Sequence, residues 1–371
     1  MNNPNPKIAM FLPNLDGGGA QRVFTYLARG LADHGYRVDM LLVSARGPYM
    51  TDLPQTVRVV PLRTRRAMAS VPSLVRYLRA ERPSCLLAAL DHTNIAAILA
   101  ARLAGASTPI IASVHVAHSR THALGKSLRQ RVVWFAIRRC YPLAQAVVAV
   151  SNGIAQDLIA TTRVPERLIR VVYNPVLMPE FAQLAQELPN HPWFTAGGPK
   201  VIVAVGGLLP AKDHHTLIRA FALLRRECNA RLVILGEGPL RLELEALVRS
   251  LGVAKDVDLP GFTRNPFAYL SHASVFALSS AWEALPTVLI EALATGIPIV
   301  ATDCPYGPSE ILDHGRYGQL VPVGDIQAMA EGMRASLNSL RCQRPLSVLQ
   351  PFTLGAAVAQ YEKIVQEVNR A

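Results

Sequence analysis

The chain alternates short apolar runs rich in β-branched residues with longer segments of helical periodicity, and this alternation constrains the fold most. The apolar runs of the first half predict strands at 7–12, 37–43, 57–62, 85–90, 109–115, 146–151 and 169–173. The segments between them predict helices at 20–34, 73–82, 94–105 and 124–140. Such alternation is typical of βαβ units, which form a parallel sheet covered by helices on both faces.

The alternation then stops and starts again. Residues 190–199 are rich in Pro, Gly and Asn and predict a linker. Beyond it, the sequence predicts strands at 201–205, 231–235, 257–259, 275–278, 299–301 and 319–321 and helices at 213–226, 239–251, 285–295, 325–338 and 354–368. We therefore predict an α/β protein with two doubly wound, Rossmann-like domains, 1–189 and 190–352, that face a central cleft, followed by a C-terminal helix within 353–371.

Composition excludes several classes of protein. Half of the residues are hydrophobic and 17% are charged, which argues against disorder. The five cysteines are scattered, without a CxxC pair, so we expect neither a disulfide framework nor a zinc site. The first fifteen residues lack the basic and apolar regions of a signal peptide, and no apolar run reaches the roughly 18–20 residues of a membrane span. We expect a cytoplasmic protein.

The net positive charge of the chain lies entirely in its first half. Residues 1–185 contain 22 Lys and Arg against 9 Asp and Glu, a net charge of +13, whereas residues 186–371 have a net charge of −1. This asymmetry predicts an anionic partner for the first domain, such as a membrane surface, a lipid phosphate or a nucleic acid. A solvated face without a partner is the alternative.

Residues 120–141 combine basic side chains with Leu, Val, Trp and Phe at helical spacing. A helix of this composition can lie on an anionic membrane, and we favour a membrane over nucleic acid as the partner. The basic residues concerned are Lys126, Arg129, Arg131, Arg138 and Arg139. The alternative is a helix packed on the core with a basic outer face.

A glycine-rich turn, DGGGAQR at 16–22, follows the first predicted strand and opens a helix. Glycines such as Gly18 and Gly19 let the backbone approach a ligand, and the helix N-terminus offers N–H groups to an anion. The turn is neither GxGxxG nor GK[ST], so it predicts neither a dinucleotide fold nor a nucleotide triphosphatase. A turn without a ligand is the alternative.

Two further loops follow predicted strands of the second domain. GGLLPAKD, at 206–213, places Lys212 at the mouth of a strand–helix loop, where its charge could neutralise a diphosphate. LGEGP, at 235–239, contains Gly236 and Glu237 in a tight turn. A solvated lysine and a purely structural turn are the respective alternatives.

Two carboxylates stand eight residues apart in SSAWEALPTVLIE, at 279–291. Glu283 falls in a loop, and Glu291 falls in a helix that Pro286 helps to start. The residues next to Glu291 are apolar, so an ordinary exposed helix position does not explain it. Two carboxylates so placed can accept hydrogen bonds from separate hydroxyl-bearing parts of one ligand.

Together these segments resemble the retaining glycosyltransferases of family 4, which have the GT-B fold. The resemblance covers nearly the full length: DGGGAQR, His115 in IIASVH, NP at 174–175, GGLLPAK, LGEGP, the Glu-x7-Glu segment and PSEIL at 308–312. The Glu-x7-Glu segment is specific in this company, whereas the glycine patches alone are not. The resemblance also implies that the last helix packs back on the N-terminal domain.

The resemblance implies roles for individual residues. Lys212 matches the lysine that contacts the donor diphosphate, Glu291 the glutamate that binds the nucleotide ribose, and Glu283 the one that reaches the donor sugar. The other residues implied in donor binding are Gly18, Gly19, Gly236, Glu237, Ala284, Leu285, Pro286 and Thr287. His115 matches the histidine near the site of reaction, so the catalytic residues implied are His115, Lys212 and Glu283.

The sequence departs from the family pattern at two positions. Gly207 stands where family members commonly have an arginine that binds diphosphate, and Arg22 and Arg264 remain alternative replacements. Ala284 replaces the usual glycine after the first glutamate, which narrows the loop near the sugar.

The resemblance implies a hexosyltransferase that moves a sugar, with retention, from a UDP-hexose or UDP-N-acetylhexosamine to a hydroxyl group. The basic first domain predicts a lipid-linked saccharide acceptor in surface polysaccharide assembly, at the inner face of the cytoplasmic membrane. We see no DxD segment of the kind that holds a divalent metal in other transferases, so we expect no metal and no cofactor. A non-hydrolysing sugar-nucleotide epimerase, which Glu-x7-Glu disfavours, and a non-catalytic two-lobed sugar-binding protein are the alternatives.

Overall fold

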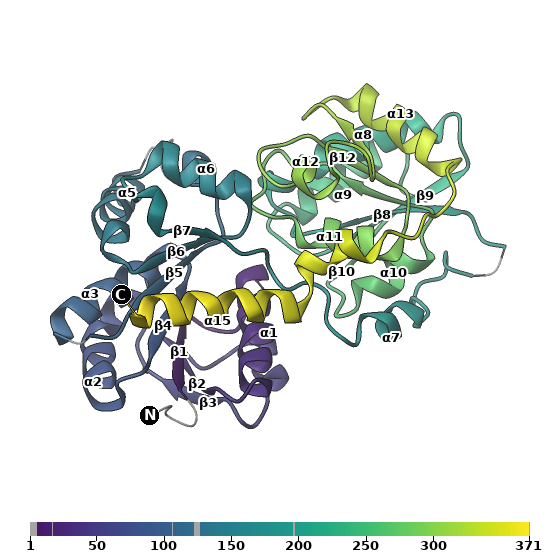
Figure 1. The fold of residues 1–371 in the computed structure, drawn as a ribbon. Helices are drawn as coiled ribbons and strands as arrows, with labels where there is room; N and C mark the ends of the chain where they lie inside the picture. The colour runs from purple at the N-terminus through teal and green to yellow at the C-terminus, as the bar shows by residue number, and fades with distance from the viewer. Residues whose placement is uncertain (1–5, 17, 106, 122–126, 196, 371) are drawn as a thin grey trace. The chain divides into compact units, whose positions relative to one another are not determined.

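The computed structural model describes residues 6–16, 18–105, 107–121, 127–195 and 197–370, and its contacts divide the chain into two compact units. Unit 1 runs to Val176 and resumes at Pro351, and unit 2 is Leu177–Gln350 (Figure 1). The sequence places the boundary after residue 189 instead. Residues beyond the observed division lie on unit 2: His191 Nε2 is 2.8 Å from Asp258 Oδ2, and α7 (Phe181–Gln186) packs against α10 (Pro266–His272).

Unit 1 contains a seven-stranded parallel sheet in the order β3-β2-β1-β4-β5-β6-β7. Its strands are β1 (Lys7–Leu12), β2 (Arg37–Leu42), β3 (Arg58–Pro61), β4 (Cys85–Ala89), β5 (Ile110–Val114), β6 (Ala146–Ala149) and β7 (Ile169–Val171). The α-helices described between them are α1 (Gly19–Asp33), α2 (Val71–Glu81), α3 (Asp91–Ala104), α4 (His118–Thr121), α5 (Leu128–Cys140) and α6 (Asn152–Thr161). The central strands β1, β4 and β5 are buried almost throughout, as strands covered on both faces require.

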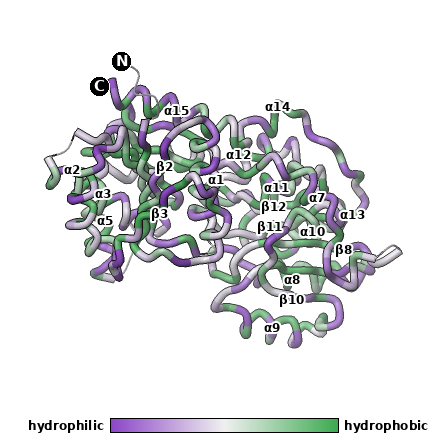
Figure 2. The backbone as a smooth tube through the Cα atoms, turned by 90° about the horizontal axis from the view of Figure 1, so that it is seen from below, coloured by the Kyte–Doolittle hydropathy of each residue, from purple (hydrophilic) through white to green (hydrophobic). Residues whose placement is uncertain are grey.

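Unit 2 contains a six-stranded parallel sheet in the order β10-β9-β8-β11-β12-β13. Its strands are β8 (Lys200–Val205), β9 (Ala230–Leu235), β10 (Val257–Gly261), β11 (Val275–Leu278), β12 (Ile299–Thr302) and β13 (Gln319–Val321). The longer helices are α8 (His214–Arg225), α9 (Arg241–Ser250), α10 (Pro266–His272), α11 (Thr287–Thr295) and α13 (Ile326–Leu337), and short α12 (Pro308–Ile311) and α14 (Leu346–Leu349) complete the unit. Hydrophobic colouring follows β11, β12 and α11 in Figure 2, and the core contains Phe221, Leu232 and Met333.

The last helix, α15 (Leu354–Arg370), packs beside α1 in unit 1 (Figure 1). Gly30 of α1 makes this approach close, because a Cβ atom there would lie 2.5 Å from Val358 Cγ2. At the end of α1, His34 Nδ1 lies 3.0 Å from Glu362 Oε1. Unit 1 is therefore assembled from two distant parts of the sequence.

Both predicted doubly wound sheets are confirmed, and the differences lie at helix ends. The helix predicted from residue 124 begins at Leu128, because Ser127 caps it and Gln130 completes the capping box. The helix predicted from Leu285 begins at Thr287, with Pro286 as its N-cap residue. The sequence pattern did not predict α6 and α10, whose N-termini are capped by Ser151 and Asn265. Among the described residues, no helix is both long and apolar enough to cross a membrane.

Candidate functional site

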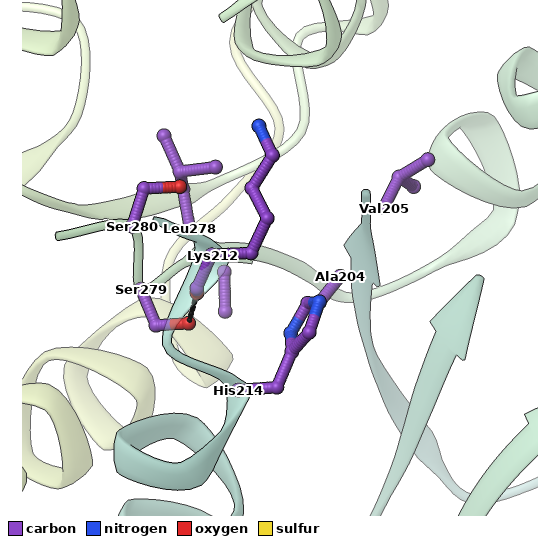
Figure 3. Close-up of a pocket in the computed structure, with 8 residues that line it drawn as sticks. Ala204, Val205, Lys212, His214, Leu278, Ser279 and Ser280 are labelled. Carbon is purple, nitrogen blue, oxygen red and sulfur yellow. Dashed lines mark hydrogen bonds between the residues drawn. The ribbon is translucent and has the colours of Figure 1, made fainter. Parts of the chain in front are cut away.

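Each sheet has one point where the strand order reverses, between β1 and β4 in unit 1 and between β8 and β11 in unit 2. In open α/β sheets, ligands bind outside the carboxyl ends of the strands at such a point. In unit 2 a small pocket lies there, and Figure 3 shows its lining side chains. They are Ala204, Val205, Lys212, His214, Ala277, Leu278, Ser279 and Ser280.

The loops that follow β8 and β11 are fastened to each other beside this pocket. The Ser279 hydroxyl donates a 2.8 Å hydrogen bond to the carbonyl oxygen of Lys212, the dashed line in Figure 3. The amide of Ala281 donates to the carbonyl of Ala211, also at 2.8 Å. Asp213, at φ 42°, then caps α8 by accepting from the amide of Thr216. Lys212 is thereby held at the point where the sheet order reverses.

Lys212 and Glu283 form an ion pair across the two loops. The Nζ–Oε1 distance is 2.5 Å, and the two side chains are 20% and 10% exposed. The same oxygen of Glu283 accepts a 2.6 Å hydrogen bond from the hydroxyl of Ser280. The backbone of Glu283 is also fixed, because its amide donates to Pro305 and its carbonyl accepts from Tyr306. The two residues expected to contact donor diphosphate and donor sugar are thus adjacent.

His214 was not predicted, and it lies next to Lys212 in the pocket lining (Figure 3). Burial and, after it, the charge of Lys212 lower its pKa to about 4, so the imidazole is neutral at pH 7. Lys212 is then the only cation among the eight lining residues. The sequence does give one signal for His214. It is a polar residue at the start of the predicted helix, immediately after Lys212 and Asp213. Ser279 and Ser280 were also missed as site residues.

The glycines of LGEGP are required by packing. Gly236 has φ 144°, and a Cβ atom there would lie 2.0 Å from the carbonyl oxygen of Gly206. At Gly238 the corresponding distance to the carbonyl oxygen of Leu208 is 2.4 Å. Between these glycines, the Glu237 side chain is exposed and pairs with Arg241 at 2.6 Å, which lowers the pKa of Glu237. The structural interpretation of this turn therefore accounts for its glycines.

Glu291 lies in the second turn of α11 and is 1% exposed. The four residues expected to face the donor through their backbone, Ala284, Leu285, Pro286 and Thr287, form the loop that leads into this helix. The N-terminus of α11 has no side-chain cap hydrogen bond. Gly307, at φ 101°, packs on this loop so closely that a Cβ atom would lie 2.5 Å from Pro286 Cδ.

In unit 1, Gly18 and Gly19 open α1. Gly18 is the N-cap residue, Gly19 is the first helical residue, and no side chain caps this end of the helix. A Cβ atom on Gly19 would meet nothing within 4 Å, and one on Gly18 would meet only the side chain of Gln21. Packing within unit 1 therefore gives no reason for glycine at residue 19.

His115 follows β5 and lies against α1. Its ring is edge-on to Phe24 of α1, with 6.0 Å between centroids, and its Nε2 is 2.9 Å from Ser113 Oγ. Burial lowers the pKa of His115 to about 4, so it is a neutral imidazole at pH 7. Ser113 also lies beside Tyr361 of α15, close enough to lower the pKa of that phenol against the larger effect of burial. The final helix therefore reaches His115 through a single serine.

The helix α5 packs against α3, with Ile137 and Cys140 buried, while its first half is exposed. Its apolar residues Leu128, Val132 and Phe135 are 75%, 58% and 61% exposed. The basic residues Arg129, Arg131 and Arg139 are exposed, and Arg138 is half-buried. The guanidinium groups of Arg138 and Arg139 lie over the rings of Trp134 and Phe135, at 5.9 Å and 5.3 Å. Lys126 lies outside the described residues.

In the part of the chain that the structure describes, no three His, Cys, Asp or Glu side chains gather in a group that could hold a metal ion. The predicted residues that the structure brings together are Lys212 with Glu283 in unit 2, and His115 with the helix that Gly18 begins in unit 1. The two replacements considered for the missing arginine do not line the pocket of unit 2. Arg22 belongs to α1 in unit 1, and Arg264 is an exposed residue beyond β10.

Two family models match this chain, one in each unit. Residues 17–177 match the family model described as Glycosyltransferase Family 4, and residues 190–344 match the model described as Glycosyl transferases group 1. The N-acetylgalactosamine-N,N'-diacetylbacillosaminyl-diphospho-undecaprenol 4-alpha-N-acetylgalactosaminyltransferase of Campylobacter jejuni is 32% identical over 67% of this chain. The match spans 65% of that relative, less than two thirds of its length.

A second Campylobacter jejuni relative matches over more of its length. It is the GalNAc-alpha-(1->4)-GalNAc-alpha-(1->3)-diNAcBac-PP-undecaprenol alpha-1,4-N-acetyl-D-galactosaminyltransferase, 26% identical over 98% of this chain and 99% of its own. Among solved structures, Anabaena HepE in complex with UDP and glucose superposes with a TM-score of 0.79 at 20% identity, over 98% of this chain and 100% of that one. That likeness concerns the fold. With both units matched by their family models, the chain belongs to the GT-B glycosyltransferases that join a family 4 N-terminal domain to a group 1 C-terminal domain.

Proposed function

We propose that the protein transfers a sugar, with retention of configuration, from a UDP-hexose or UDP-N-acetylhexosamine to a hydroxyl group of a lipid-linked saccharide in surface polysaccharide assembly. The observation that carries this proposal is the Lys212–Glu283 pair at the strand-order reversal of unit 2. There a cation for the leaving diphosphate stands next to a carboxylate for sugar hydroxyls. The names of the two Campylobacter jejuni relatives, which specify undecaprenol-linked acceptors, support the acceptor class.

In this proposal unit 2 binds most of the donor, and unit 1 contributes Gly18 and Gly19 to donor binding as well as the acceptor side. Lys212 and the N-terminus of α11 stabilise the diphosphate as negative charge develops on it. Glu291, from the same helix, accepts hydrogen bonds from the ribose. His115 contacts the sugar near the reacting carbon as a neutral imidazole, so it can accept or donate a hydrogen bond without adding charge. No step in this scheme requires a metal ion.

The test is a donor screen that measures release of UDP or GDP from a panel of nucleotide sugars, with and without an undecaprenyl-diphosphate-linked saccharide. We expect slow release from one UDP-sugar, faster release when the acceptor is added, and an α-linked product. Activity should survive EDTA. A sugar nucleotide converted to its epimer would identify the epimerase alternative, and binding without turnover would identify a sugar-binding protein.

We further propose that α5 places the enzyme on the anionic surface where such an acceptor resides. Leu128, Val132 and Phe135 recur at helical spacing and are exposed, and exposed arginines flank them. The basic residues on an anionic membrane contribute about 1 kcal/mol each, and bound apolar side chains add to this. Ile137 and Cys140 are buried against unit 1, and these three apolar side chains remain exposed beside that contact.

Co-sedimentation with liposomes tests the role of α5. Binding should require anionic lipid, weaken with salt, and fall when Arg129, Arg131, Arg138 and Arg139 are replaced by Gln. A matched control replaces four exposed arginines of unit 1 outside α5: Arg63, Arg65, Arg66 and Arg76. Equal binding to neutral liposomes, or equal loss in the control, would refute the proposal for α5.

A further inference from the structure

The ion pair of Lys212 and Glu283 joins the two residues that the proposed function assigns to different parts of one donor. The 2.5 Å bond joins Lys212 Nζ to Oε1 of Glu283, and it forms in the protein alone. Ser280 donates to this same oxygen at 2.6 Å. Carboxylate and diphosphate are both strong acceptors for an ammonium group, so they compete for Lys212.

The competition matters because this pocket has one cation. Gly207 occupies the position where the family pattern has an arginine, and His214 is neutral at pH 7. Lys212 is therefore the only positive charge among the lining residues. Figure 3 shows its ammonium group directed away from the His214 ring, so that ring does not hold it in place. Glu283 and a diphosphate therefore compete for the same ammonium group.

The surroundings of Glu283 make an exchange feasible. When Lys212 turns to a diphosphate, Ser280 still donates to Oε1, so the carboxylate keeps one partner. The Glu283 backbone is fixed by Pro305 and Tyr306 and stays in place. A sugar hydroxyl that donates to Glu283 would replace the lost lysine bond. A nucleoside diphosphate without a sugar offers no such hydroxyl.

We propose that Glu283 makes the site discriminate between donor and product by competing for Lys212. With a nucleotide sugar, hydroxyl groups satisfy Glu283 and release Lys212 to the diphosphate. With the nucleoside diphosphate product, no sugar hydroxyl donates to Glu283. Glu283 then pairs with Lys212 again, which weakens product binding. This inference rests on the proposed function, and it adds a specificity role to a residue assigned there to sugar contact.

The experiment measures UDP binding by calorimetry in a double-mutant cycle of Lys212→Met and Glu283→Gln. Glu283→Gln should bind UDP roughly tenfold more tightly than the unmodified protein, because a neutral amide holds the ammonium group less strongly. That gain should vanish when Lys212→Met is present. Glu243→Gln, which removes an exposed carboxylate on α9, serves as the charge-matched control and should leave UDP affinity unchanged.

The cycle separates three outcomes. Unchanged or weaker UDP binding by Glu283→Gln would overturn the inference, since Lys212 would then bridge both anions. A gain that persists with Lys212→Met would also overturn it, because the carboxylate would be repelling the diphosphate directly. If the unmodified protein binds neither UDP nor GDP, the proposed function itself fails.

Discussion

The edge of unit 1 where the strand order reverses and the equivalent edge of unit 2 both carry glycines, but the glycines are there for different reasons. Gly236 could not carry a Cβ atom, which would lie 2.0 Å from a backbone oxygen of its own unit. Gly19 could carry one freely, since nothing lies within 4 Å. A glycine that the fold demands says little about ligands. A glycine with no such demand is the better pointer to close approach by a ligand, and here that glycine is in unit 1.

The two edges also differ in charge. The side chains assembled at the edge of unit 1 include a neutral His115, whereas the edge of unit 2 holds the Lys212–Glu283 ion pair. The proposed function therefore assigns electrostatic stabilisation of the leaving diphosphate to unit 2. The effects that we expect from substitutions follow from this difference in charge between the two units.

The largest expected effect comes from removing the cation of unit 2. Lys212→Met should lower kcat/KM by about 100- to 1000-fold, the range typical of losing one preorganised charge-stabilising group. Lys255→Met, at an exposed position before β10, should leave the rate unchanged. Steady-state kinetics with the donor found in the screen measures both. Full activity of Lys212→Met would break the comparison, because the charge would then come from elsewhere.

The glycine contrast predicts the next largest effect. Gly236→Ala should lower the free energy of unfolding by about 2–4 kcal/mol, because a Cβ atom meets backbone and the backbone conformation is strained. Gly19→Ala should change it by less than about 1 kcal/mol and should instead weaken donor binding. Denaturant unfolding and calorimetry measure the two quantities. Equal loss of stability in both variants would contradict the contrast.

A substitution of Glu291 tests whether unit 2 binds the nucleotide. Glu291→Gln should raise the donor KM about tenfold, because it replaces a charged acceptor of ribose hydrogen bonds. Since the side chain is 1% exposed, Glu291→Ala would also leave a cavity and is the less informative change. Glu331→Gln, on the exposed face of α13, is the control. Unchanged nucleotide binding by Glu291→Gln would refute the ribose assignment.

The smallest expected effect is on the pH dependence of stability, to which one histidine in each unit should contribute in the same way. His115 and His214, one in each unit, have pKa values lowered to about 4 from 6.5. Between these pH values the unfolded chain binds more protons, so stability should rise as pH increases from about 4 to 6.5 and then level off. Each histidine contributes less than about 1.4 kcal/mol per pH unit. Denaturant unfolding across this range should give a shallower slope for His115→Gln and for His214→Gln, and an unchanged slope would refute the shifts.

The sequence was most informative where one short stretch decides the structure. Strand β1 was predicted at its observed bounds, because all its residues after Lys7 are apolar and buried, on both faces of the sheet. The ends of α5 and α11 were misplaced, because Ser127 and Pro286 act as caps only in a particular backbone geometry. The division of the chain was expected after residue 189, since composition does not register that residues 181–186 pack on α10.

For the site, the sequence named Lys212 and Glu283 but could not place one beside the other. Their 2.5 Å contact depends on the register of two loops that are 71 residues apart in the chain. His214, Ser279 and Ser280 were missed because polar residues at strand–helix junctions are common, and only burial in the pocket distinguishes these three. The reason for Gly236 was equally out of reach, since it depends on a carbonyl from another strand end.

The return of α15 to unit 1 has a consequence for how the protein is made. Residues 1–176 emerge from the ribosome long before Leu354–Arg370, because all of unit 2 is synthesised in between. During that interval Gly30 lacks its close neighbour Val358. Unit 2 is one continuous segment and can complete its fold as it emerges, while the earlier-made unit waits for the last helix. The half that begins first is therefore finished last, and premature termination near residue 350 would leave the N-terminal half without its covering helix.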